Sequence, residues 1–103
     1  MTIYVDNLNL RAAVKNGSKT HTSRWCHLMT DSSDAELVAF AKRIGLKPQW
    51  LQDPGTFTSH FDVTETKRRA AVEAGAIEIS WRDLGALLEC RRMGRPYRQQ
   101  PTT

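Results

Sequence analysis

Two stretches of the chain, from Thr2 to Asp6 and from Thr58 to Val63, alternate between hydrophobic and polar residues, which is the pattern of a half-buried β-strand. A third strand is predicted from Trp25 to Met29, with Trp25, His27 and Met29 on one face. Two shorter stretches, Lys47 to Gln52 and Ala76 to Ile79, are also predicted to be strands. The first of these contains Pro48, which lacks a backbone N–H and is therefore compatible only with a sheet edge or a strand start.

Three other segments, residues 33–45, 64–75 and 80–94, carry the start and stop signals of α-helices. Each begins at a serine or threonine that can cap the first turn, and each ends at a glycine. The first also has apolar residues at helical spacing, namely Leu37, Phe40, Ala41 and Ile44. These signals predict three helices that each follow a strand.

The resulting order, ββα(β)βαβα, predicts an α/β fold. We expect a small single-domain sheet of about four to five strands with about three covering helices, at least partly parallel. Residues 1–90 are expected to form this domain, with residues 7–23 as a long polar loop around the turn Asn16-Gly17-Ser18. Residues 91–103 are expected to form a basic, flexible C-terminal tail.

The composition is that of an ordinary globular protein, with 40% hydrophobic and 25% charged residues. A chain of 103 residues is long enough for one modest core. No apolar run approaches the ~20 residues of a membrane span, and the first residues do not resemble a signal peptide. We therefore expect a cytoplasmic protein without a membrane partner. Cys26 and Cys90 lack metal-ligand spacing and are expected to be free thiols.

The net charge of +4 is concentrated in two basic segments that contain no acidic residue. The first segment holds Arg11, Lys15, Lys19 and Arg24, and the second holds Arg91, Arg92, Arg95 and Arg98. Clustered cations attract phosphate groups, although such segments are also common as plain solvated surface. The arginine-rich tail therefore makes nucleic acid one expected partner, bound without sequence specificity and in a salt-sensitive way.

Residues able to carry chemistry lie where strands are predicted to run into helices. His60 and Asp62 share one face of a predicted strand, and His27 lies on the same face as Trp25 and Met29 in another. The carboxyl ends of parallel strands meet at one edge of a sheet. Parallel pairing is therefore expected to gather Asp6, Asp31, His60, Asp62 and Lys67 there.

Two chemical functions fit this set of residues. In the first, the protein binds a phosphorylated small molecule or nucleotide: His60, Asp62 and Lys67 are the central, catalytic-type residues, and His27, Asp31, Arg68, Trp25 and Trp50 contact the ligand. In the second, a divalent cation held by Asp6 and Asp62 activates water for nuclease-like phosphoester hydrolysis. The residues leave open whether a bond is broken and whether a metal is used.

Each candidate also has a purely structural interpretation. His27 fits a core histidine bonded to a backbone carbonyl, and Asp31 fits a helix cap. Lys67 and Arg68 fit the exposed first turn of a helix, where cations slightly oppose the helix dipole. Exposed sheet edges in so small a domain also keep a homodimer among the alternatives.

Several short strings resemble one known family. They are Tyr4-Val5-Asp6, Cys26-His27-Leu28, Glu36-Leu37, Arg43-Ile44-Gly45, His60-Phe61-Asp62, Lys67-Arg68 and Gly75-Ala76. Together they resemble the DUF4031 family, a small domain of unknown function found in bacteria and phages, over nearly all of residues 2–88. The resemblance implies a compact single domain but no activity. Members often have histidine where this chain has Val38 and tyrosine where it has Phe61, which weakens any essential role for those positions.

Overall fold

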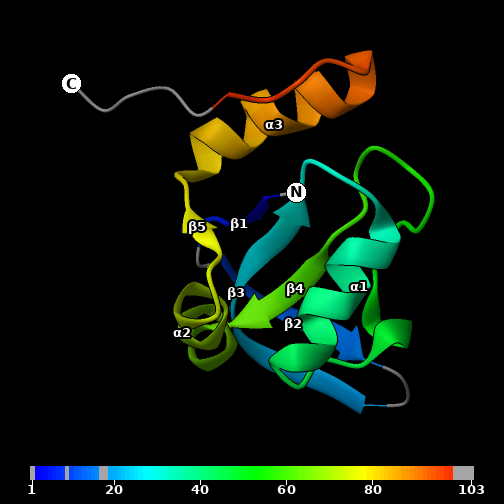
Figure 1. Ribbon diagram of the computed structural model, residues 1–103. Coiled ribbons are helices and arrows are strands. Elements are labelled where there is room, and N and C mark those ends of the chain that lie inside the picture. The colour runs from blue at the N-terminus through cyan, green and yellow to red at the C-terminus, as the bar shows by residue number, and fades with distance from the viewer. Residues whose placement is uncertain (1, 9, 17–18, 99–103) are drawn as a thin grey trace.

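The computed structural model describes residues 2–8, 10–16 and 19–98, with side chains for residues 2–8 and 24–98 (Figure 1). The elements are β1 (Ile3–Val5), β2 (Leu10–Asn16), β3 (Lys19–Thr30), α1 (Asp34–Arg43), η1 (Pro48–Trp50), β4 (Phe61–Thr64), α2 (Glu65–Glu73), β5 (Ile77–Glu78) and α3 (Trp81–Met93). This confirms the predicted class, a small α/β domain with a mixed sheet and three helices in the described part of the chain.

The sheet is organised around the long strand β3. At Trp25, β3 pairs with Leu10 of β2 and with Thr64 of β4, and at Leu28 it pairs with Val5 of β1 and again with β4. A strand has only two edges, so β1 and β2 lie one after the other along the same edge of β3, and β4 occupies the opposite edge. β1 also pairs in parallel with β5, which makes the sheet mixed.

A bulge separates β1 from β2. Val5 pairs with Leu28 and Leu10 pairs with Trp25, so between these two pairs the chain is two residues longer on the side of β1 and β2 than on the side of β3. The backbone N–H of Asp6 still donates to the carbonyl oxygen of His27, at 3.0 Å, before the ladder is interrupted. Bulges redirect the side chains that they contain. This one directs the carboxylate of Asp6 toward His27.

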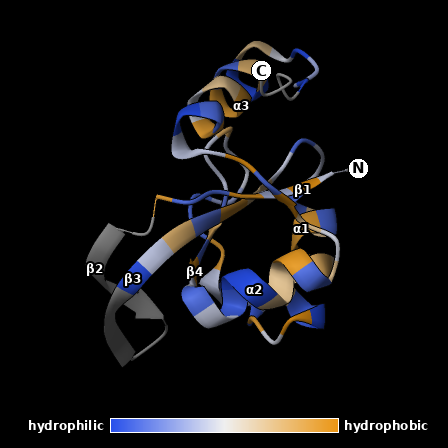
Figure 2. Ribbon diagram, turned by 90° about the vertical axis from the view of Figure 1, so that its left-hand side faces the viewer, coloured by the Kyte–Doolittle hydropathy of each residue, from blue (hydrophilic) through white to orange (hydrophobic). Residues whose placement is uncertain are grey.

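The sheet carries a hydrophobic cluster on each face. α1 and α2 cover one face and α3 covers the other, as Figure 2 shows from the side. The first cluster contains alternate strand residues such as Val5, Leu28, Phe61 and Val63, together with Leu37, Phe40 and Ala71 of the helices. The second is smaller and consists of Tyr4, Met29, Ile79, Leu84 and Leu87. Alternate residues of the three predicted strands therefore face opposite sides of the sheet, as expected. β1 is buried on both faces instead of one, and β4 begins at Phe61 and not at Thr58.

The helix signals read from the sequence are confirmed by hydrogen bonds. The hydroxyl of Ser33 accepts from the backbone N–H of Glu36, that of Thr64 from Lys67, and that of Ser80 from Asp83. α3 ends at Gly94, which adopts the left-handed conformation with φ of 68°. None of the helices in the described residues is long and apolar enough to cross a membrane.

Three expected segments are wrong. Residues 7–23 are not a long loop, because β2 and the first part of β3 form a hairpin there; the expected turn at Gly17 and Ser18 lies outside the described residues. The stretch Lys47 to Gln52 is not a strand, since Pro48 begins a 3-10 turn and only Gln52 makes a bridge, to His60.

The third is the start of the expected C-terminal tail. Arg91 to Met93 still belong to α3, and the ring of Tyr97 packs edge-on against Tyr4 at 5.1 Å between ring centroids. This aromatic contact could not be predicted from the sequence, where Tyr97 stands among arginines. Residues 99–103 lie outside the described part.

Candidate metal centre

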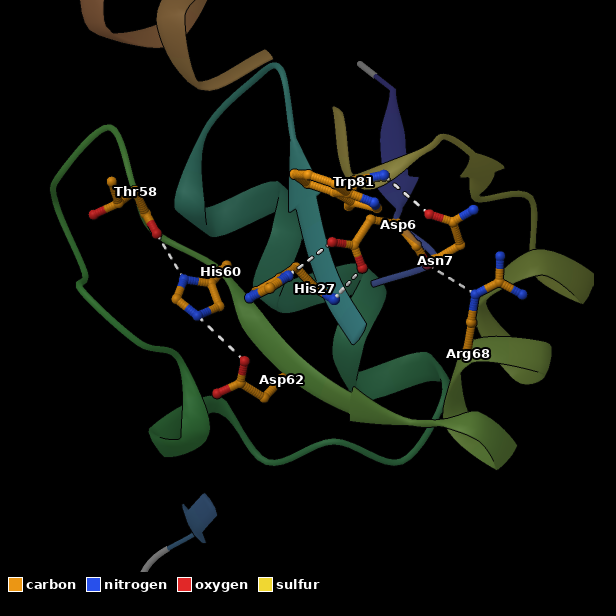
Figure 3. A network of polar contacts seen from close by, with 8 residues as sticks. All are labelled: Asp6, Asn7, His27, Thr58, His60, Asp62, Arg68 and Trp81. Carbon is orange, nitrogen blue, oxygen red and sulfur yellow. Dashed lines mark hydrogen bonds and ion pairs between the residues drawn. The ribbon is translucent and has the colours of Figure 1, made fainter. Parts of the chain in front are cut away.

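Strands β3 and β4 bring two histidines and an aspartate together. His27 pairs directly with Asp62, and His60 lies two residues before Asp62, immediately before the start of β4 at Phe61. Paired residues and residues two apart lie on the same face of a sheet, so all three side chains point to one side. One ligand atom from each lies within 4.8 Å of the other two (Figure 3).

His27 is oriented by Asp6, the residue in the bulge. Its Nδ1 lies 2.8 Å from Oδ2 of Asp6, and its backbone N–H donates to Oδ1 of Asp6 at 2.7 Å. The Asp6 side chain is fully buried, and each of its two oxygens contacts His27. An ionised carboxylate can only accept, which places the ring proton on Nδ1 and leaves the lone pair of Nε2 free to bind a metal.

His60 is oriented in the same way by the backbone. Its Nδ1 donates to the carbonyl oxygen of Thr58 at 2.7 Å, and its Nε2 lies 3.4 Å from Oδ1 of Asp62. Burial lowers the pKa of His60, but the hydrogen bonds to Asp62 and Thr58 and the nearby negative charges outweigh this, and the pKa is raised above its ordinary value of 6.5. In the metal-free protein Nε2 therefore holds a proton readily, and a bound cation would replace that proton.

The three side chains remain accessible to water. The exposed fraction is 27% for the side chain of His27 and 17% for those of His60 and Asp62. The two imidazole rings meet edge to face, with 5.3 Å between their centroids. Two imidazole nitrogens and one carboxylate form a ligand set that suits zinc, iron or manganese and leaves positions open for water or substrate.

The bulge that carries Asp6 is itself held by two helices. Nε of Arg68 in α2 donates to the carbonyl oxygen of Asp6 at 2.8 Å, and Nη1 of Arg68 pairs with Glu78 at 3.1 Å. The backbone N–H of Trp81, at the start of α3, donates to Oδ1 of Asn7 at 3.0 Å. Arg68, expected in a ligand clamp, thus lies behind Asp6.

Lys67 and Asp31 also lie away from the histidines. Nζ of Lys67 donates to the carbonyl oxygen of Ile44 at 2.7 Å, where α1 ends. Ile44 is followed by Gly45, which has a φ of 85°. A Cβ at this position would lie 2.7 Å from Nζ of Lys67, so only glycine leaves room for the lysine here. Asp31 accepts from the backbone N–H of Thr2 at 2.9 Å at the far end of β1.

The expected site residues therefore separate into groups. His27, His60 and Asp62 come together, and Asp6 lies behind His27 and is not placed as a ligand beside Asp62. The sequence could not predict that the backbone carbonyl of Thr58 orients His60, because every residue has a backbone carbonyl. The bonding partner of His27 is a carboxylate and not the backbone carbonyl of its structural interpretation.

A small cavity adjoins Asp62. It has a volume of about 160 Å³ and is lined by Trp25, Leu46, Trp50, Asp62, Val63, Thr64 and Lys67. Both tryptophans that the sequence placed in a ligand site are thus found here. The cavity lies beside β4, which in the described part of the sheet pairs only with β3.

A larger groove of about 810 Å³ lies on another part of the surface, between the start of α1, residues 55–57 and the end of α3. Asp34 anchors this region by accepting from the hydroxyl of Ser59 at 2.6 Å and from the N–H of Gly55 at 2.7 Å. Burial opposes ionisation of Asp34, but these bonds and the charge of Arg91 lower its pKa below the ordinary value of 3.8. Arg91 in turn donates to the carbonyl of Ser59 at 2.9 Å.

Fold and site together define a small α/β domain with a carboxylate-supported histidine centre on the sheet. The chain belongs to the DUF4031 family, described as proteins of unknown function, whose model matches residues 3–91. No curated protein and no solved structure shows significant similarity to the chain.

Proposed function

We propose that this protein is a metal-dependent hydrolase of phosphoesters, with a divalent cation held by His27, His60 and Asp62. One observation carries the proposal: each histidine has its Nδ1 engaged by an acceptor, the carboxylate of Asp6 or the carbonyl of Thr58. Such partners orient imidazole ligands in metal sites and fix the ring proton on the nitrogen that does not face the metal.

The distances are compatible with a site that tightens on binding. Ligand atoms at about 2.1 Å from a metal are about 3–3.5 Å apart in tetrahedral or octahedral geometry. Nε2 of His60 and Oδ1 of Asp62 are already 3.4 Å apart, whereas the widest separation in the set is within 4.8 Å. Side-chain rotations that shift atoms by about 1 Å complete the coordination.

Three protein ligands leave room for water and substrate. A divalent cation at such a site supplies Lewis-acid chemistry and lowers the pKa of water toward 7. The residues of this chain hold and orient it, and the partly exposed rings of His27 and His60 leave the substrate side open to solvent. The net charge of +4 and the exposed Arg24 beside Trp25 favour an anionic substrate.

Hydrolysis is favoured over ligand binding through a Lys67 and Arg68 clamp. The two cations are anchored in different places, Lys67 at the end of α1 and Arg68 on Asp6 and Glu78, so they do not form a joint clamp. Nucleic-acid binding through the arginine-rich segment is also less favoured, because Arg91 already donates hydrogen bonds to the carbonyl and hydroxyl oxygens of Ser59. The metal-dependent function is therefore the one that the side-chain geometry supports best.

The test is metal-dependent stability followed by activity. A cation at about 100 times its Kd adds about 2.7 kcal/mol to the free energy of unfolding, which raises the melting temperature by on the order of 10 °C. We expect this shift with Zn²⁺ or Mn²⁺ in the wild type and its loss in His60→Ala and Asp62→Ala. Asp31→Ala is the matched control, because Asp31 lies at the far end of β1 and should retain the shift.

Activity is then measured on bis(p-nitrophenyl) phosphate, a generic phosphodiester, with and without the cation that shifts the melting temperature. Metal-dependent hydrolysis that is lost in Asp62→Ala supports the proposal. The absence of any shift with Zn²⁺, Mn²⁺, Co²⁺ or Fe²⁺ in the wild type overturns it.

A further inference from the structure

The small cavity and the proposed metal centre share Asp62. His27 and Asp62 form one cross-strand pair, and Trp25 and Thr64 form the pair two residues further along β3 and β4. Both pairs point to the same face of the sheet, and two residues span about 7 Å along a strand. Asp62 therefore belongs to the metal centre at one end and lines the cavity at the other.

The size of the cavity limits what it can hold. Sites that enclose a whole drug-sized ligand measure about 300–1,000 Å³. At about 160 Å³ this cavity has room for one ring system and not for a complete nucleotide. A substrate that uses both the cavity and the metal centre must therefore carry a compact group about 7 Å from the reacting atom, which is the arrangement of a base and a phosphate joined through a pentose.

The lining of the cavity favours a planar ring with polar edges. Trp25 and Trp50 supply indole surface, and Leu46 and Val63 supply aliphatic surface. Lys67 adds hydrogen-bond donors: an ammonium group has three N–H bonds, and the carbonyl of Ile44 takes one of them. The remaining two can donate to ring nitrogens or exocyclic oxygens of a heterocycle.

We propose that this cavity is the base subsite of the hydrolase, so that the substrate is a nucleotide or a nucleotide-containing phosphoester. The inference rests on the proposed function for the reacting end of the substrate, but the recognition of the base depends only on the cavity. A base stacks on the indole surface, Lys67 donates to its edge, and the pentose spans the distance to Asp62. The phosphoester then lies beside the three metal ligands.

The experiment compares ligands with and without a base. Binding of the four nucleoside 5′-monophosphates and of ribose 5-phosphate is measured by calorimetry on the full chain, both metal-free and with Mn²⁺. Base stacking on an aromatic side chain contributes about 1–3 kcal/mol, which is about 5- to 140-fold in affinity. We expect at least one monophosphate to bind tighter than ribose 5-phosphate by this factor, and Trp50→Ala to lose the difference.

Phe57→Ala is the control, because Phe57 is an exposed aromatic residue that lines the other groove. A readout without any variant is the NMR signal of the indole N–H groups, which should shift for Trp25 and Trp50 on titration with the monophosphate. Equal binding of ribose 5-phosphate and the monophosphates, or unchanged indole signals, overturns the subsite. A preference for the base that depends on Trp50 in a chain that binds no metal supports the subsite and overturns the hydrolase.

Discussion

The substitution Asp6→Asn is expected to remove metal binding without touching a metal ligand. Asp6 is fully buried, and its Oδ2 lies 2.8 Å from Nδ1 of His27. An asparagine is nearly isosteric and can still accept from the backbone N–H of His27 through its oxygen. Its NH₂ group then faces Nδ1, so Nδ1 must become the acceptor and the ring proton moves to Nε2. A protonated Nε2 has no lone pair for a cation.

The size of the effect follows from these contacts. Loss of a partner that orients a histidine ligand typically weakens metal affinity by 10- to 100-fold. In the metal-free protein the hydrogen bond between His27 and the Asp6 carboxylate is replaced by a neutral one, which lowers the free energy of unfolding by about 1 kcal/mol. For a domain of this length, that lowers the melting temperature by about 4–8 °C. The affinity and the stability should therefore both fall, by amounts that can be measured separately.

Calorimetric titration with Zn²⁺ or Mn²⁺ measures the affinity, and thermal melting of the metal-free protein measures the stability. The ring ¹⁵N shifts of His27 report the tautomer directly, with the proton on Nδ1 in the wild type and on Nε2 in Asp6→Asn. Asp31→Asn removes one carboxylate at the far end of β1 and controls for the change in net charge. Unchanged metal affinity in Asp6→Asn, with His27 still protonated on Nδ1, would refute the role assigned to Asp6.

Three further substitutions test the framework of the fold. Because the pKa of Asp34 is lowered, its carboxylate stabilises the fold fully above about pH 4 and loses this effect as the pH falls through the lowered pKa; Asp34→Asn should flatten this acid dependence in urea unfolding between pH 7 and pH 2.5. Lys67→Met removes the donor to the carbonyl of Ile44 and should lower stability by about 1–3 kcal/mol in urea unfolding, with metal affinity unchanged. Leu87→Ala opens the second cluster at a fully buried position and should lower stability by about 2–5 kcal/mol, whereas an effect below about 1 kcal/mol would show that α3 is not docked as described.

The parts of the site that could be predicted are those that depend on local periodicity. His60 and Asp62 share a face because strand residues alternate, and the sequence shows this alternation through Phe61 and Val63. The three helices were equally readable, since their hydroxyl caps and glycine ends are local signals. The position of His27 within a predicted strand also made it a candidate, although its contact with Asp6 was not predicted.

The parts that could not be predicted depend on pairing between distant segments. The hairpin of β2 and β3 consists largely of polar residues, so no hydrophobic alternation marked it, and its ladder rests on backbone hydrogen bonds. Lys67 was expected near the histidines, but the direction of its long side chain depends on the nearby end of α1. The position of Asp6 against His27 depends on a bulge whose length appears only when both strands are aligned.

The bulge is needed for the contact between Asp6 and His27 but not for the pairing of the sheet. Its excess is two residues, so a chain two residues shorter between Val5 and Leu10 could pair with β3 as one continuous strand. The sheet would persist, but the carboxylate would no longer be presented to His27. Among related chains, the length of this segment should therefore indicate whether the histidine centre is competent better than the presence of the two histidines themselves does.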